Sequence, residues 1–337
     1  MITLCCAYMI SQYRSVRPLK NKSFSYWLKT YNGQKFYTTL LFLLIPLVLL
    51  VVFTFIPAIN MIGYSFQSRD QFGINVENVG LENYKTVFTN PDYFVTFKNS
   101  LYYMAGSVFQ QIFALLLATI LCSKIKLKNL FKGVLFFPYL MNGVAVSLIF
   151  RRFFQQGDGI ISQDGTLNSI ITALGGQSIA FLQNPVLANI CMVFASIWKY
   201  IGFDIIMYIG AIQSINTDIY EAADLDGANP WQRFRYIVFP EIKPIISLQL
   251  ILAVKGAISV FEIPYIITGG KFGTSTFVIK TIETGFVYKK VGLASAMAVV
   301  LLIITIIVTL LQKLLFKEED SVPKKEKAKG RLKRRIM

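Results

Sequence analysis

Glu221-Ala222-Ala223-Asp224-Leu225-Asp226-Gly227 is the stretch that decides the fold of this chain, together with Ile237-Val238-Phe239-Pro240, which begins ten residues after the glycine. Both segments lie in a polar loop between two long apolar stretches. A loop of this length stays close to the ends of the helices that flank it. The segment therefore predicts a small helical structure held at a membrane surface.

Capping signals divide this loop into two short helices. Asp218 is expected to cap the first helix, with Glu221 three residues later in capping-box spacing, and Gly227 is expected to end it. Asn229 is expected to cap the second helix, and Pro230 fits its first position, where a missing N–H costs little. Apolar side chains then recur at helical spacing, which gives the second helix a face that can pack on the membrane bundle.

Composition places the chain among membrane proteins. Hydrophobic residues make up 54% of it and charged residues only 15%, against about 25% charged residues in soluble domains. The apolar residues gather in runs that are each close to the length of a membrane-spanning helix. These runs are 37–64, 97–122, 131–150, 186–212, 242–267 and 291–316. We predict an all-α membrane protein with about six transmembrane helices.

The distribution of Lys and Arg predicts the orientation, because basic residues collect on the cytoplasmic side. A basic amino-terminal segment, 1–36, and a basic tail, 317–337, flank a transmembrane domain at 37–316. Both termini and the loop 212–241 are therefore expected to be cytoplasmic. The net charge of +16 fits this topology and contact with anionic lipid, and no basic folded surface suggests nucleic-acid binding.

Several sequence features that are missing narrow the function. The chain has no histidine, which is the commonest general base and metal ligand, and its four cysteines form no zinc-binding pattern. It also lacks a Gly-x-x-x-x-Gly-Lys-Ser/Thr loop for binding ATP phosphates. We therefore predict that the chain is not an enzyme and holds no metal or cofactor. If transport is ATP-driven, ATP must bind a separate polypeptide.

The Glu-Ala-Ala…Gly…Ile-x-x-Pro spacing resembles the cytoplasmic "EAA" loop of ABC importer permeases, with Phe239 where that family usually has Leu. The likeness extends over about residues 36–316. Leu81–Tyr84, Phe136–Tyr139 and Ile197–Phe203 resemble segments of carbohydrate-type permeases, the class of the maltose-type and glycerol-phosphate-type subunits.

This resemblance implies a type I ABC importer transmembrane domain in the bacterial cytoplasmic membrane, carrying an oligosaccharide or related glycoside. It implies a second homologous permease subunit, a cytoplasmic ABC ATPase dimer that holds ATP and Mg²⁺, and an extracytoplasmic sugar-binding protein. The loop would be the coupling helix that docks on the ATPase. Its coupling residues would be Glu221, Ala222, Ala223, Asp226, Gly227 and Pro240.

Polar residues inside the predicted spans are candidates for the solute path, because ionisable groups at membrane depth usually face a cavity or one another. Lys255, Ser259 and Glu262 fall at i, i+4 and i+7, on one face of a helix. This spacing fits a polar wall of the path, and equally a structural Lys–Glu contact. Asn142 is a further candidate. Three more polar residues, which also fit simple contacts between helices, are Gln110, Gln111 and Asp204.

Other functions stay open from the sequence. A secondary transporter or channel would use the intramembrane charges with an ion gradient and without an ATPase. A membrane enzyme such as a lipid-modifying transferase would need convergent catalytic groups at one interface, and no such motif is evident. An importer of a non-sugar solute would share the coupling loop.

Overall fold

The computed structural model describes residues 31–69, 72, 76–123, 125–157 and 163–315. All but the end of the predicted segment 1–36, and the whole predicted tail 317–337, lie outside the described residues. The chain divides into two compact units, residues 1–61 and 62–337.

Most of one long apolar helix lies in the first unit. α3 (Tyr31–Leu50) continues through a π-helical turn, η1 (Val51–Phe55), into α4 (Ile56–Tyr64). Gln34–Tyr64 is long and apolar enough to cross a membrane, and none of its most apolar window is buried. A helix that is apolar on every side needs lipid or protein around it. This element confirms the predicted run 37–64.

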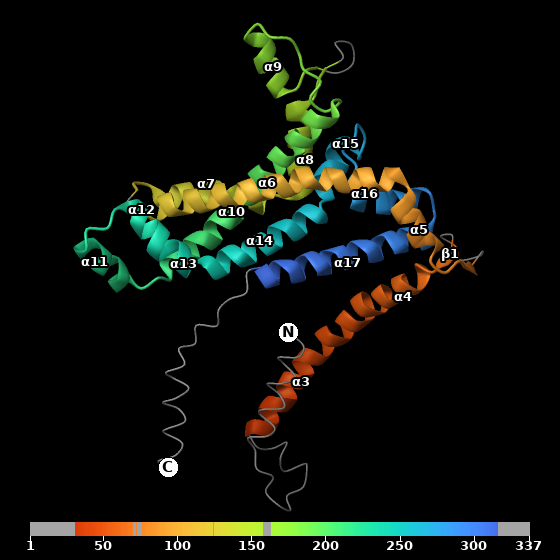
Figure 1. Cartoon of the computed structure of the whole chain (residues 1–337), viewed down its shortest axis with the longest axis horizontal. Helices are drawn as coiled ribbons and strands as arrows, with labels where there is room; N and C mark the ends of the chain where they lie inside the picture. The colour runs from red at the N-terminus through yellow and green to blue at the C-terminus, as the bar shows by residue number, and fades with distance from the viewer. Residues whose placement is uncertain (1–30, 70–71, 73–75, 124, 158–162, 316–337) are drawn as a thin grey trace, which may run out of the picture. The chain divides into compact units, whose positions relative to one another are not determined.

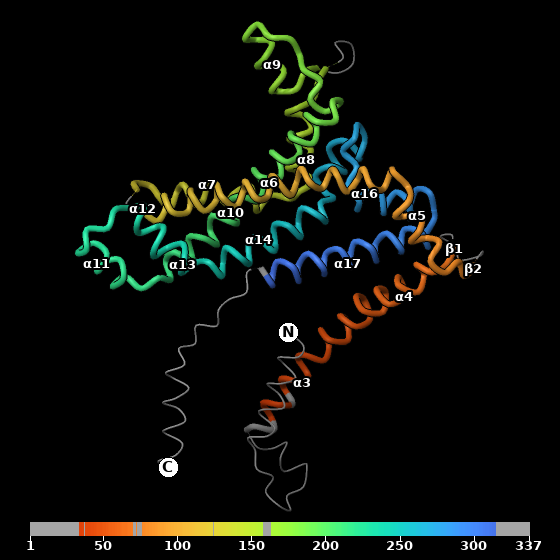
Figure 2. The backbone as a smooth tube through the Cα atoms, in the orientation of Figure 1, coloured from red at the N-terminus to blue at the C-terminus, as the bar shows by residue number. Residues whose placement is uncertain are grey.

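The second unit is a helical bundle. Its long helices are α6 (Pro91–Cys122), α10 (Pro185–Gln213), α14 (Lys243–Ile258) and α17 (Val291–Leu315). α10 packs on α6, and α14 packs on α6 and α17 (Figures 1 and 2). Small residues let these helices approach closely, as is usual in membranes. Fully buried examples are Ala114, Ala118, Ala188 and Ala195.

The third predicted run is a pair of helices joined at a sharp bend. α7 (Lys128–Leu140) packs on α10, and α8 (Gly143–Phe154) departs from it at a bend of 95° (Figure 1). Asn142 caps α8, because its side-chain oxygen accepts a hydrogen bond from the N–H of Val144 at 2.8 Å. The described chain thus has five helices able to span a membrane, or six if the bent pair counts as one, in agreement with the prediction.

The fifth span is also interrupted, which the sequence did not predict. α14 ends at Ile258, and α15 (Glu262–Thr268) begins only after three non-helical residues. Pro264 gives a physical reason: it has no N–H to donate within a continuous helix, but in the first turn of α15 that N–H is not needed. The prediction that Lys255, Ser259 and Glu262 share one helical face is therefore wrong.

Short elements occupy the ends of the bundle (Figure 1). One end holds an antiparallel pair of strands and short helices: β1 (Gln67–Arg69), β2 (Val76–Asn78), α5 (Glu82–Thr89), α16 (Phe277–Ile282) and η3 (Glu283–Val287). α9 (Thr166–Ala173) follows α8. The opposite end holds α11 (Thr217–Leu225), α12 (Pro230–Arg233), η2 (Phe234–Val238) and α13 (Phe239–Glu241).

Candidate functional site

The loop between α10 and α14 begins with α11, whose cap differs from the prediction. Asn216 caps the helix by accepting a hydrogen bond from the N–H of Asp218 at 3.1 Å. Asp218 lies inside the first turn, where its charge complements the positive end of the helix dipole. The predicted cap at Asp218, with Glu221 completing a capping box, is therefore wrong by two residues.

The end of α11 follows the prediction. Gly227 has a φ of +74°, and its N–H donates to the carbonyl of Asp224 at 3.2 Å. The next N–H, of Ala228, donates to the carbonyl of Ala223 at 2.9 Å. These two bonds form a Schellman ending, which satisfies carbonyl groups that the helix leaves free.

The start of α12 also follows the prediction. Asn229 and Gln232 form a reciprocal capping box, with side chain to backbone distances of 2.9 and 2.8 Å, and Pro230 occupies the first helical position. Since the Schellman ending of α11 runs directly into this capping box, the turn between the two helices is defined by its own hydrogen bonds.

An ion pair that the sequence did not reveal braces α11 against α12. The Nη1 atom of Arg233 lies 2.5 Å from Oδ1 of Asp224, and its Nε donates to the carbonyl of Ala228 at 3.0 Å. Both side chains are partly exposed, so the pair adds little to stability, about 1 kcal/mol or less. It links the end of α12 directly to α11.

The outer side of this loop is uncovered. Leu225 is 90% exposed and Trp231 is 68% exposed, although both are large and apolar. Ala223 is half-buried, and the other predicted coupling residues are exposed: Glu221, Ala222, Asp226, Gly227 and Pro240. Exposed apolar side chains beside acidic ones form a surface suited to a protein partner.

The inner side of the loop packs on the bundle through Tyr220, which contacts the core cluster that contains Val238 and Ile242. Its hydroxyl oxygen is buried and has no hydrogen-bond partner among the described residues. Burial raises the pKa of the Tyr220 phenol, and Cys122 and Glu241 add to the effect.

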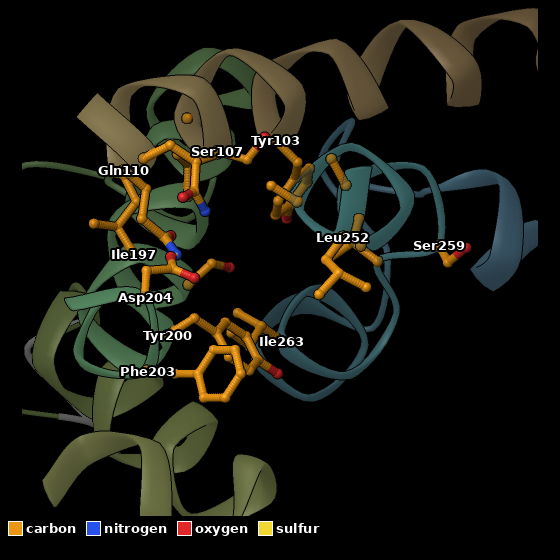
Figure 3. A pocket seen from close by; sticks show the side chains of 18 of the residues that line it. Tyr103, Ser107, Gln110, Ile197, Tyr200, Phe203, Asp204, Leu252, Ser259 and Ile263 are labelled. Carbon is orange, nitrogen blue, oxygen red and sulfur yellow. The ribbon is translucent and has the colours of Figure 1, made fainter. Parts of the chain in front are cut away.

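A cavity of about 550 Å³ lies inside the bundle, between α6, α10, α14 and α15 (Figure 3). Aromatic rings from two helices line one part of it, and polar side chains from three helices line another. The aromatic residues of the first part are Tyr139, Tyr200 and Phe203, and Tyr103 and Phe261 also line the cavity; the polar residues include Ser107, Gln110, Gln111, Ser196, Asp204 and Gln249.

Asp204 joins three helices at the wall of this cavity. Its Oδ2 accepts a hydrogen bond from Nε2 of Gln110 on α6 at 2.6 Å, and its Oδ1 accepts one from Nε2 of Gln249 on α14 at 3.1 Å. On the next turn of α10, the hydroxyl of Tyr208 donates to Oε1 of Gln111 at 2.6 Å. Figure 3 shows Gln110 and Asp204 side by side at the cavity wall.

Glu262 forms an ion pair with a residue of another span. Nζ of Lys199 on α10 lies 3.4 Å from Oε2 of Glu262. The carboxylate also packs against Gly143, where any Cβ atom would overlap it. Because Gly143 is the first residue of α8, the negative charge lies at the positive end of that helix.

The structure separates the predicted solute-path residues. Ser259 and Glu262 line the cavity, whereas Lys255 and Asn142 are not among its described lining residues. Glu262 does form a Lys–Glu contact with another span, but its described ion-pair partner is Lys199 and not Lys255. Gln110, Gln111 and Asp204, which the sequence singled out only as polar residues within spans, all line the cavity. Gln249 was missed, since a lone amide in an apolar run carries no local signal.

Residues 110–318 match the family model described as "Binding-protein-dependent transport system inner membrane component". The chain belongs to this family. It is thus the multi-pass permease component of an ABC importer of the inner membrane, and the match includes the α11–α12 loop and most of the cavity-lining residues.

Two relatives and one solved structure are similar to this permease over most of its length. The multiple sugar-binding transport system permease protein MsmF of Streptococcus mutans is 33% identical over 77% of this chain and 88% of its own length. The arabinooligosaccharides transport system permease protein AraP of Bacillus subtilis is 33% identical over 75% of this chain and 80% of its own. A bacterial ABC transporter involved in import of the acidic polysaccharide alginate shares the fold, with a TM-score of 0.74 and 21% identity over 86% of this chain and 98% of that one.

Proposed function

We propose that this permease imports a carbohydrate, an oligosaccharide or related glycoside, as one of two membrane-spanning subunits of its transporter. The relatives named for sugar uptake support the carbohydrate class. The observation that carries the proposal is a cavity within the bundle that combines aromatic rings with hydroxyl and amide groups. Sugars present apolar ring faces and many hydroxyl groups, so such a wall complements them.

The α11–α12 loop is the proposed docking surface for a cytoplasmic ABC ATPase dimer. ATP and Mg²⁺ bind that partner, and this chain supplies no catalytic group. Glu221 and Asp226 offer charge to the partner, Ala222 and Ala223 keep α11 slim, and Gly227 turns the chain. Pro240 lies at the start of the return to the membrane. The exposed Leu225 adds an apolar contact that the sequence did not predict as part of this surface.

Coupling follows from the way this loop is built. The Asp224–Arg233 pair and the two capping motifs hold α11 and α12 at one angle. A movement of the ATPase is therefore passed to α10 and α14, which flank the loop and form walls of the cavity. The spans then alternate between inward-facing and outward-facing arrangements. This mechanism places both termini in the cytoplasm.

The remaining proposed partners act on the outer side and within the membrane. An extracytoplasmic sugar-binding protein delivers the solute, and a second homologous permease subunit completes the pathway. Ser259 and Glu262 border the path. Lys255 and Asn142, which the sequence suggested for the same role, do not line the cavity, and Asn142 caps α8.

The experiment that tests this proposal is a mild-detergent purification of the chain from its native membrane, with identification of every protein that accompanies it. We expect an ATPase with a phosphate-binding loop, a second permease and a sugar-binding protein. The variant Leu225→Asp, which changes the exposed loop, should no longer purify with the ATPase but should still purify with the second permease. A chain that purifies alone and transports in vesicles without ATP would instead be a secondary transporter or channel.

A further inference from the structure

The charged residues that line the cavity are all acidic. The charged side chains that line it are Asp204 and Glu262, and none of its described lining residues is a lysine or an arginine. Glu262 is offset by the ammonium group of Lys199 at 3.4 Å. No ion pair among the described residues includes Asp204. The net charge that the cavity presents to a solute is therefore that of Asp204.

The hydrogen bonds of Asp204 fit a carboxylate. Each of its two oxygens accepts a bond from a glutamine Nε2, and amide nitrogen only donates. An asparagine at this position has one acceptor oxygen and would leave one of these two donors without a partner. The acid therefore serves to join the helices, and its charge acts on any solute in the cavity as well.

We propose that Asp204 makes this permease selective for uncharged sugars and against anionic ones, such as uronates and sugar phosphates. This inference rests on the proposed function. At an effective dielectric of about 20, two like charges ~6 Å apart repel enough to weaken binding by on the order of 100-fold. The shared fold does not decide this point, since the transporter that imports an acidic polysaccharide has it too.

The rest of the wall suits an uncharged polyol. The rings of Tyr139 and Phe203 stack, with centroids 4.9 Å apart, and Tyr200 meets Tyr139 edge-on at 6.4 Å. Such a group offers an apolar surface to a sugar ring. A carboxylate whose two oxygens have spare lone pairs accepts hydrogen bonds from sugar hydroxyls. It offers nothing to a second carboxylate or a phosphate.

The charge preference can be measured without knowing the sugar. Ser107 lies one turn before Gln110 on α6 and lines the same cavity, so Ser107→Cys places a thiol near Asp204 (Figure 3). In permeabilised membranes that contain the full chain and its partners, this thiol is treated with methanethiosulfonates carrying a trimethylammonium, a sulfonate or no charge. The rate measured with each reagent is divided by the rate of that reagent with a free thiol in solution. The reaction of the native cysteines, measured in the chain that lacks the new cysteine, is subtracted.

We expect the corrected rate with the cationic reagent to exceed that with the anionic reagent by at least tenfold. Asp204→Asn should bring this ratio close to one, and Glu77→Gln, which removes an exposed acid outside the cavity, should leave it unchanged. A ratio near one with Asp204 in place would overturn the proposal, even if the Asp204 variant failed to fold. A thiol that no reagent reaches, including the neutral one, would overturn it as well, since the cavity would then be closed to solutes.

A failure of the charge preference can be distinguished from a failure of the proposed function. A chain that purifies with its ATPase and shows no charge preference keeps its role as an importer and loses the selectivity assigned to Asp204. A charge preference in a chain without an ATPase would retain the role of Asp204 in another kind of transporter.

Discussion

Glu221, which begins the Glu-Ala-Ala stretch, is exposed, and its side chain makes no hydrogen bond or ion pair with the described residues, so its replacement reports on the partner. We expect Glu221→Gln to lower substrate-stimulated ATP hydrolysis and uptake by about tenfold, the scale of one charged contact at an interface, while membrane insertion is unchanged. Reconstituted vesicles give both rates. Glu241→Gln on the same loop is the matched control. Full uptake by the Glu221 variant would remove the coupling role assigned to this residue.

Gly227 ends α11 with a φ of +74°, and a Cβ atom there would meet nothing within 4 Å. The cost of a side chain is therefore in the backbone, about 1–2 kcal/mol for an ordinary residue. We expect Gly227→Ala to lower coupled uptake, and Gly227→Asn to lower it less, because asparagine enters this conformation more easily. Equal losses for the two variants would show that something other than backbone conformation matters here.

At Gly202 on α10 the cost of a side chain is steric, unlike at Gly227. A Cβ atom there would overlap the backbone at Leu135 and Phe136 of α7. We expect Gly202→Ala to force the helices apart and to destabilise the chain by about 1–3 kcal/mol. The control is Gly210→Ala on the same helix, where a Cβ meets nothing within 4 Å. Thermal unfolding of the detergent-solubilised complex should separate the two, and equal melting temperatures would contradict the close approach of α7 and α10.

At the scale of helices, two tyrosines test how much a buried hydroxyl group contributes to the stability of the bundle with and without a hydrogen-bond partner. Tyr208 donates to Gln111 at 2.6 Å, and Tyr220 has no partner among the described residues. We expect Tyr208→Phe to destabilise the complex by about 1–3 kcal/mol, because it leaves an acceptor unsatisfied, and Tyr220→Phe to be neutral or stabilising. Thermal unfolding measures both. A loss of stability on Tyr220→Phe as large as that on Tyr208→Phe would reveal a partner for the Tyr220 hydroxyl.

Helix positions were predictable to the extent that their signals are local. A run of apolar residues near membrane length is visible in the sequence, and so are the caps at Asn229 and Gly227. The cap of α11 was misplaced because Asn216 and Asp218 are both good capping residues two positions apart, and only the backbone shows which one precedes the helix. The break before α15 was missed because Pro264 is a single helix-breaking residue within a long apolar run, and the run by itself predicts a continuous span.

At the scale of the whole molecule, the family and the two-helix loop between α10 and α14 could be predicted from the sequence, and the cavity could not. Glu262 pairs with Lys199, 63 positions away in the chain, and Asp204 bonds to residues on two other helices. Such partners depend on which helices become neighbours, and no spacing within one span encodes that. Periodicity therefore suggested a single helical face in the fifth span, where the structure has a wall made by several helices.

The two interrupted spans have a mechanical consequence. The first residue of α8, Gly143, touches the first residue of α15, Glu262, and α8 and α15 pack on each other. The interruptions thus meet at one level of the bundle, beside the cavity. A continuous helix can curve gently with its backbone hydrogen bonds intact, but a sharp kink interrupts them. Among the described residues the helical hydrogen bonding is already interrupted in both segments at this place, so a change of angle there would break fewer backbone hydrogen bonds than in a continuous helix.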